Sequence, residues 1–391
     1  MLPLLHPPRR EAPEPEARAQ LAALLHLPGA RAAAGFPDLH PGAHGPVGCA
    51  LLTEAWVHPA VVGGDVGCGI GLWRLPLPAR RRRDLDALVE QLQGIDAPWE
   101  GDGRAWLAAH GAGGAPDGVG TIGGGNHFLE IQEVEEILLP DAALGLAAGD
   151  AVLAVHTGSR GHGRRLLAEH ALRHGAAGLP EDHPDAQAWI TGHDAAVAWA
   201  RANRALCAAR AADALGLTLE TLLDVPHNLV ERRPDGWLHR KGAAAADRGP
   251  VLLPGSRGDA SWIVQPLPCA EGGLLSLAHG AGRRLSRAQA RARLADVPAA
   301  HLARARGGAR VVCGDPALLR EEAPEAYRPI ADVVGGLEDA GLARPAVRLR
   351  PLLTFKSSTA DPRRGQREDA HRRRDLERRD ARRAKERGRW A

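Results

Sequence analysis

The chain lacks any long hydrophobic run. Among its 391 residues, no apolar segment approaches the roughly 20 residues that a membrane-spanning helix needs. The N-terminus, MLPLLHPPRREAPEPEA, has prolines and acids where an export signal would carry an unbroken apolar segment. Both absences favour a cytoplasmic protein that does not enter a membrane.

Cysteine is also scarce, and no two cysteines are spaced as CxxC. An odd number of scattered cysteines in a reducing compartment predicts free thiols and excludes a disulfide framework. The same spacing excludes a zinc finger of the usual kind. The five cysteines are Cys49, Cys68, Cys207, Cys269 and Cys313.

Lysine is nearly absent, since arginine supplies almost all of the positive charge and only Lys241, Lys356 and Lys385 remain. The formal net charge is +3, but residues 361–391 contain 13 basic and 7 acidic residues, a net of +6. Residues 1–360 therefore carry a net charge of −3. The basic tail is either a solvated segment, helical or disordered, or an arm that contacts RNA.

The remaining composition, 44% hydrophobic and 25% charged, is typical of a soluble globular protein. Apolar periodicity predicts helices at 16–27, 81–92, 163–175, 185–215 and 327–342. Short apolar runs predict strands at 71–77, 151–157, 250–256, 261–267 and 309–315, and 36–48 is expected to be a loop. We predict one large α+β domain over residues 1–360, followed by the basic extension 361–391, because helices and strands do not alternate regularly.

The segment GGDVGCGIG at 63–71 places a carboxylate, Asp65, and a thiol, Cys68, among five glycines. His127, His156 and His227 lie in similar glycine-rich or loop settings, where side chains can converge. Imidazole, carboxylate and thiolate together suit divalent metals of borderline softness, and a thiolate can bridge two ions. Any single histidine is more simply a loop residue, but the set predicts a site for one or two metals.

Two glycine-rich segments, GTIGGGNHF at 120–128 and HGAGRRLSR at 279–287, could cradle phosphate through consecutive backbone N–H groups. Arg160 and Arg283 would add guanidinium groups suited to phosphate oxygens. Neither segment is a Walker A or dinucleotide fingerprint. The alternative for either segment alone is a set of tight turns.

Together these motifs resemble the RtcB family of RNA ligases, over roughly residues 36–356. The motifs occur in the family's order and are PDLHPG, GGDVGCGIG, GTIGGGNHFLEI, HTGSRG, HN at 227, RKGA at 240, PGS at 254, HGAGRRLSR and AYRPI at 326. The chain departs from the family pattern at PGSRGDASW and IVQP, and it continues for 35 residues after Lys356. A divergent paralogue of the ligase is therefore one interpretation.

The resemblance implies an enzyme that uses GTP and two manganese ions to join RNA ends in repair or tRNA splicing. Those ends are a 3′-phosphate or 2′,3′-cyclic phosphate and a 5′-hydroxyl, and an archease-like activator is a possible partner. His279 would be the nucleophile that takes GMP. The implied metal ligands are Asp65, Cys68, His127, His156 and His227, with Cys68 shared.

The resemblance also assigns the residues around the nucleotide. Asp38, Arg160 and Arg283 would serve catalysis alongside His279. The implied nucleotide-binding residues are Asn126, Phe128, Glu130, Lys241, Ser261, Gly280, Ala281, Gly282, Tyr327 and Lys356. Two alternatives remain, a metal-dependent phosphoesterase and a noncatalytic RNA-binding relative, and neither would need a nucleotide acceptor such as His279.

Overall fold

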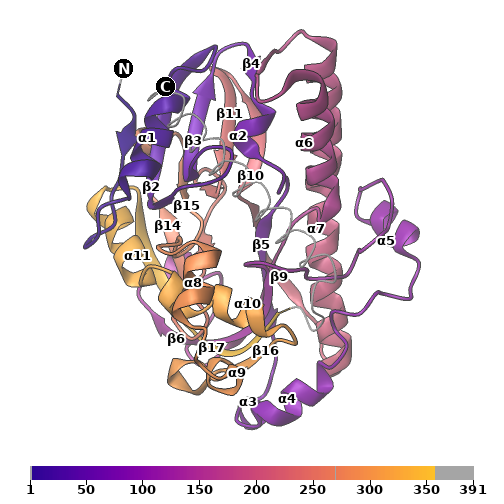
Figure 1. Ribbon diagram of the computed structural model, residues 1–391. Helices are drawn as coiled ribbons and strands as arrows, with labels where there is room; N and C mark the ends of the chain where they lie inside the picture. The colour runs from indigo at the N-terminus through magenta and orange to yellow at the C-terminus, as the bar shows by residue number, and fades with distance from the viewer. Residues whose placement is uncertain (1, 269, 357–391) are drawn as a thin grey trace, which may run out of the picture.

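A large, almost entirely antiparallel sheet forms the centre of the protein (Figure 1). The computed structural model describes residues 2–268 and 270–356. The strand order is β13, β14, β17, β6, β7, β5, β9, with β16 parallel to β17. The bounds are β5 Gly69–Leu75, β6 Phe128–Ile137, β7 Ala151–Thr157, β9 Glu220–Pro226, β13 Val251–Leu253, β14 Ser261–Pro266, β16 Arg310–Val312 and β17 Ala343–Phe355.

A second sheet has the order β1, β2, β3, β11, β10. Two short pairs, β12 with β15 and β4 with β8, complete the strands of the described residues. The bounds are β1 Leu4–Leu5, β2 Ala30–His40, β3 Val47–Thr53, β4 Trp56–Val57, β8 Leu179–Pro180, β10 Asn228–Arg233, β11 Gly236–Lys241, β12 Ala243–Ala245 and β15 Ser276–Ala278.

The helices pack around these sheets, and the longest, α7, runs along one side of the molecule beside β5 and β7 (Figure 1). The bounds are α1 Pro15–Leu24, α2 Pro59–Val62, α3 Ala79–Arg82, α4 Leu85–Gln91, α5 Gly103–Ala109, α6 Gly161–His174, α7 Pro184–Leu215, α8 Arg287–Arg293, α9 Ala299–Leu302, α10 Pro316–Glu321 and α11 Ile330–Asp339. No helix in the described part of the chain is long and apolar enough to cross a membrane.

Alanine brings α7 close to the large sheet. Ala208 and Ala211 are fully buried and pack with Leu153 and Val155 of β7 in one hydrophobic cluster. Small side chains let the helix backbone approach the strands, so that polar residues on the same face can reach the ends of those strands. The position of α7 places this helix directly behind the turn that carries Cys68.

The predicted α+β class is confirmed, and the helices expected at 163–175 and 185–215 appear as α6 and α7. The strand expected at 151–157 is β7. The loop expected at 36–48 is wrong at both ends, because β2 continues to His40 and pairs with β3, which begins at Val47. Phe36 and Leu39 are fully buried there, and that burial favours a strand despite Pro37. The expected basic tail, 361–391, lies outside the described residues.

The helix expected at 81–92 is also divided, into α3 and α4. Asp84 separates them, and its side chain accepts a hydrogen bond from the Ala87 amide as the N-cap of α4. The helix expected at 327–342 begins later, at Ile330, directly after Pro329. Local capping and proline chemistry therefore set these boundaries.

Buried histidines should make the fold sensitive to acid, and His239 of β11 is the clearest case. Burial, with His58 nearby, lowers the pKa of His239 to about 3. An unfolded histidine titrates near pH 6.5. The contribution of His239 to the free energy of unfolding is therefore fully present above that pH and decreases as the pH falls toward 3. For this residue alone we expect a loss of about 2 kcal/mol in unfolding free energy between pH 7 and pH 5.

Urea unfolding of the parent and of His239→Gln, each at pH 7 and pH 5, measures that contribution. The substituted protein should lose about 2 kcal/mol less than the parent over the same pH interval. Equal losses in the two proteins would show that His239 does not cause the acid sensitivity.

Candidate active site and metal centre

The segment GGDVGCGIG forms the turn that enters β5. Within it, the Cys68 amide donates to the backbone oxygen of Asp65 at 3.0 Å. Gly67 has a φ of +77°, and a Cβ at this position would lie 2.9 Å from the Cβ of Ala200 in α7. A residue without a side chain is needed for the turn to press against the helix. The glycines therefore allow Cys68 to sit at the sheet edge with its backbone against α7.

Three histidines reach the same edge of the large sheet. His127 directly precedes β6, His156 is the penultimate residue of β7, and His227 directly follows β9. Strand β5 pairs with both β7 and β9, and β6 pairs with β7. Because these neighbours are antiparallel, the start of β5 and β6 and the end of β7 and β9 coincide.

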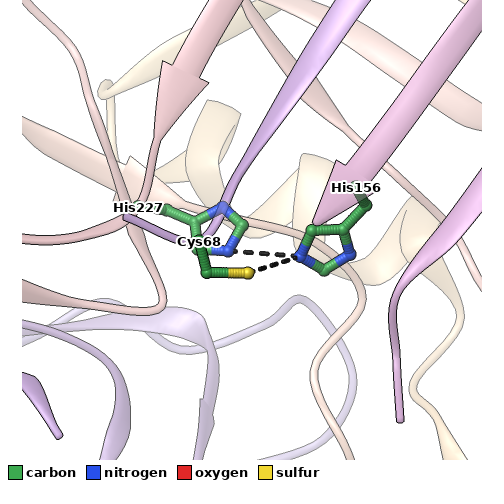
Figure 2. Close-up of side chains that lie close together, drawn as sticks. All are labelled: Cys68, His156 and His227. Carbon is green, nitrogen blue, oxygen red and sulfur yellow. Dashed lines mark hydrogen bonds between the residues drawn. The ribbon is translucent and has the colours of Figure 1, made fainter. Parts of the chain in front are cut away.

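The ligand atoms of these residues converge on Cys68. Figure 2 shows the Cys68 thiol and the His227 ring facing the His156 ring. Cys68 Sγ lies 3.2 Å from His156 Nε2 and 3.4 Å from His127 Nε2. His156 Nε2 is 3.3 Å from His227 Nε2, and His127 Nε2 is 3.6 Å from Asp65 Oδ2. All five predicted ligands are therefore together.

These atoms form two groups that share one member. Cys68, His156 and His227 make one, and Asp65, Cys68 and His127 make the other, with the ligand atoms of each group within 4.8 Å of one another. A thiolate can bridge two ions, and imidazole and carboxylate complete a set suited to divalent transition metals. The arrangement fits one or two such ions.

Hydrogen bonding at His127 and burial at His156 and His227 favour the metal-binding forms of these rings. The His127 Nδ1 atom lies 3.2 Å from the Ile122 carbonyl oxygen, so a proton on Nδ1 leaves the Nε2 lone pair free. Burial, together with neighbouring imidazoles, lowers the pKa of His156 and of His227 far below the usual value. Burial also raises the pKa of the Cys68 thiol, so that metal binding would release its proton.

His279, directly after β15, lies beside this cluster. Its ring centroid is 4.7 Å from that of His227. Asp38 of β2 is fully buried, and its Oδ2 accepts hydrogen bonds from the His279 backbone N at 2.9 Å and from Nδ1 at 2.6 Å. A carboxylate bound to Nδ1 fixes the tautomer with a free lone pair on Nε2. The pair presents an oriented imidazole nitrogen next to the metal ligands.

The segment GTIGGGNHF packs against Arg160. Gly123 has a φ of +87°, and a Cβ there would overlap the Arg160 guanidinium at 1.4 Å from Nη1. Arg160 itself has a φ of +56° and lies at the N-terminus of α6. The guanidinium therefore lies directly over Gly123, where a side chain would displace it and would also strain the backbone. Asn126 is half-buried in the turn before His127.

Two of the rare lysines are held by backbone carbonyls. Lys356 Nζ donates to the oxygens of Gly125 and His127, both at 3.2 Å. Lys241 Nζ donates to two carbonyls of the turn between β2 and β3, and its Nζ is 3.8 Å from a Cβ built at Gly63. Burial lowers the pKa of both side chains. The two ammonium groups flank the segments that carry the metal ligands.

A buried polar network lies on β6, β14 and β17. Gln132 Nε2 donates to Ser261 Oγ at 2.8 Å and to Glu130, which also accepts from Thr354. Burial raises the pKa of Glu130, although these hydrogen bonds oppose the shift. Phe128, at the start of β6, has its ring centroid 5.4 Å from that of His156. This network joins Glu130 and Ser261, which are 131 positions apart in the sequence.

Arg283 lies on the Tyr327 side of the site. Its Nη1 donates to the Tyr327 hydroxyl at 3.0 Å and to Glu322 at 3.1 Å, and its guanidinium carbon is 4.9 Å from the Tyr327 ring centroid. The Tyr327 hydroxyl in turn donates to Glu322. Arg283 therefore contacts Tyr327 directly, and both residues also bond Glu322, which no sequence motif indicated.

The glycines after His279 hold that loop against its neighbours. The Ala281 amide donates to the Pro254 oxygen at 3.1 Å. Gly282 has a φ of +68°, and a Cβ there would lie 2.5 Å from the backbone oxygen of Asp38. Gly280 likewise packs on Pro254. These contacts fix the backbone that carries His279.

Several residues that support the site were not identified from the sequence. Asn228 Nδ2 donates to the Asp65 backbone oxygen at 3.3 Å, and its Oδ1 accepts from the Gly242 amide at 2.6 Å. Asn203 and Arg204 are fully buried in α7. A polar pair within an alanine-rich helix was the available signal, because such residues stay buried only when they are bonded.

The family comparison matches nearly the whole described chain. The model described as tRNA-splicing ligase RtcB matches residues 20–112 and 96–357. The RNA-splicing ligase RtcB2 of Escherichia coli is 42% identical over 351 residues, covering 87% of this chain and 91% of that protein. The RNA-splicing ligase RtcB of Mycobacterium tuberculosis is 32% identical over 428 residues, covering 85% of this chain and 99% of that protein. The chain belongs to the RtcB family.

Proposed function

We propose that this protein joins RNA that ends in a 3′-phosphate or 2′,3′-cyclic phosphate to RNA with a 5′-hydroxyl, through a GMP adduct on His279. The observation that supports this most directly is the position of His279. An imidazole oriented by a buried carboxylate lies 4.7 Å, ring to ring, from His227, a candidate metal ligand. Membership of the family and the names of the relatives support the ligase class.

Two manganese ions are proposed to bind the five clustered side chains. Asp65, Cys68 and His127 would hold one ion, and Cys68, His156 and His227 the other. When bound, the ions supply positive charge that neutralises phosphate oxygens and stabilises the charge that develops during phosphoryl transfer.

His279 is proposed as the nucleophile toward GTP. With its Nδ1 proton held by Asp38, the Nε2 lone pair attacks the α-phosphorus, the bond to the bridging oxygen breaks, and pyrophosphate leaves. A 3′-phosphate oxygen of RNA then attacks the same phosphorus and releases His279. Finally the 5′-hydroxyl loses its proton, its oxygen attacks the RNA phosphorus, and GMP leaves.

The remaining residues are proposed to surround the nucleotide. Asn126 would contact the α-phosphate, and Arg160 would neutralise phosphate charge from its position over Gly123. Lys241 would contribute positive charge toward the phosphates from its position beside Gly63. The residues proposed to surround the guanine base, together with the loop that follows His279, are Phe128, Glu130, Ser261, Gly280, Ala281, Gly282, Tyr327 and Lys356.

Arg283 has a different proposed role from direct phosphate binding. Its hydrogen bonds to Tyr327 and Glu322 would fix the phenol ring at the base side. Burial opposes ionisation of Glu322, but Lys356, Arg283 and Arg287 lower its pKa to about 2. A charged Glu322 therefore anchors the arginine and the tyrosine together.

Family membership supports RNA as the substrate. The chemistry of the RNA ends and an archease-like activator as a second partner are proposed on the resemblance alone. The proposed domain is residues 1–360, with 361–391 as a separate basic extension of net charge +6. Repair and tRNA splicing are both compatible with this chemistry.

Incubation of the full chain with Mn²⁺ and α-labelled GTP, followed by a denaturing gel, tests the function. We expect a labelled protein band, and addition of RNA with a 3′-phosphate and a 5′-hydroxyl should discharge the band and yield a longer RNA. Removal of phosphate from the RNA without labelling of the protein would instead identify a phosphoesterase. Binding of RNA without either reaction would identify a noncatalytic relative.

A further inference from the structure

Two consecutive residues of α7, Asn203 and Arg204, lie behind the clustered ligands. Both are 0% exposed, and neither belongs to either group of candidate metal ligands. Burying a guanidinium and an amide costs free energy unless every polar atom finds a partner. The hydrogen-bond partners of these two side chains therefore indicate their role.

One nitrogen of Arg204 joins two ligand-bearing segments. Its Nη1 donates to the backbone oxygen of Gly67 at 2.8 Å and to that of Thr157 at 2.9 Å. Gly67 directly precedes Cys68, and Thr157 directly follows His156. The separation of these two ligands is thus set through a single NH₂ group.

The other edge of the guanidinium holds a third segment. Arg204 Nε and Nη2 donate to the two carboxylate oxygens of Asp224 at 2.9 and 2.6 Å. Asp224 lies in β9, three residues before His227. A planar fork can make this two-point contact while its remaining N–H groups reach the first two segments, whereas an ammonium group cannot.

Asn203 reaches the fourth segment. Its Oδ1 accepts from the Gly120 amide at 2.7 Å, and its Nδ2 donates to the Thr121 oxygen at 3.2 Å. The next residue, Ile122, supplies the carbonyl oxygen that lies against His127 Nδ1. The amide therefore holds the backbone that orients the His127 ring.

We propose that Asn203 and Arg204 form one positioning element that sets the spacing of Cys68, His127 and His156, and of His227 as well. The helix makes the element rigid, because adjacent residues of one α-helix cannot move apart. The proposal rests on the metal centre proposed above. It adds that the geometry of that centre is fixed from α7 by residues that contact no ion.

The test is Co²⁺ binding to the full chain, followed by visible absorption and metal analysis, in the parent and in Arg204→Lys. Lysine keeps the charge but loses the fork, so we expect Co²⁺ affinity to fall about 10- to 100-fold and the thiolate-to-cobalt band to change. Circular dichroism should remain that of the parent. A purely structural role would lower thermal stability without changing the cobalt spectrum.

Arg240→Lys is the matched control, because Arg240 of β11 is also 0% exposed and its guanidinium also holds several buried partners. Those partners are Glu231, the Ser276 hydroxyl and the Leu275 carbonyl, and none of them adjoins a candidate ligand. We expect parental Co²⁺ affinity and spectrum in this variant. An equal change in Arg240→Lys and Arg204→Lys would show a general effect of replacing a buried guanidinium and would overturn the proposal.

Two further outcomes decide the proposal. If Arg204→Lys does not fold, Asp224→Asn keeps the side-chain shape while weakening the fork, and it should also shift the cobalt band. Parental affinity and spectrum in a folded Arg204→Lys or Asp224→Asn would overturn the positioning role while leaving the metal centre intact. A parent protein that binds no Co²⁺ would contradict the metal centre itself, and the positioning role with it.

Discussion

Cys68→Ala should still fold, with lower stability, but should lose the metal ions proposed to bind its cluster and reduce RNA sealing by more than about 100-fold. The physical reason is that Cys68 Sγ belongs to both groups of candidate ligands, 3.2 Å from His156 and 3.4 Å from His127. Loss of the shared atom leaves each ion with two protein ligands. Metal content by mass spectrometry and the rate of joining labelled RNA measure the two effects.

Cys207→Ala makes the same chemical change at a matched buried position. Cys207 packs in the cluster between α7 and the large sheet and is not among the candidate ligands. We expect unchanged metal content and nearly unchanged sealing. Full metal content and full rate in Cys68→Ala would contradict the shared-ligand arrangement.

His279→Ala should still bind Mn²⁺ and GTP but should form no labelled adduct, with sealing from GTP reduced to background. The five candidate metal ligands are separate from His279, so removal of this ring leaves their spacing unchanged. RNA supplied with GMP already attached to its 3′-phosphate should still be sealed, because that substrate bypasses the nucleophile. Gel labelling and RNA joining with the two substrates measure the difference.

The bond to the adduct identifies the residue class independently. A phosphate bound to imidazole is labile in acid and stable in alkali. A phosphate ester of serine is instead stable in acid and is cleaved in strong alkali. Asp38→Asn is a milder variant, because it keeps a polar group near His279 Nδ1 but removes the negative charge. We expect it to slow labelling of the protein without abolishing metal binding. An acid-labile adduct that persists in His279→Ala would assign the nucleophile to another histidine.

Residue chemistry made the metal cluster predictable from the sequence. Cysteine, histidine and aspartate in glycine-rich or loop segments selected Asp65, Cys68 and the three histidines as a set, and the structure brings all five together. Helices α6 and α7 were predictable because both segments are long and rich in strong helix formers, alanine above all in α7. The resemblance supplied His279, and the structure adds Asp38 as its hydrogen-bond partner.

Features that depend on distant partners were not predictable. The acids of β6 and the arginines and prolines of β17 obscure a strand pattern, yet the two strands pair. Arg350 bonds Glu133 at 2.9 Å, and Arg348 bonds Glu135 at 2.7 Å. Each charge is tolerated because the neighbouring strand provides its partner. Arg283 and Tyr327 likewise share a distant partner, Glu322, and no local pattern indicates it.

The strand order has a consequence for how the protein acquires its metals. Cys68 meets His127 and His156 across 59 and 88 residues of sequence, so the ligands are dispersed in the unfolded chain. Ions then bind the folded state preferentially, and a free ion at 1,000 times its Kd adds about 4 kcal/mol to the free energy of unfolding. Metal supply during synthesis should therefore govern how much of this protein survives as folded molecules.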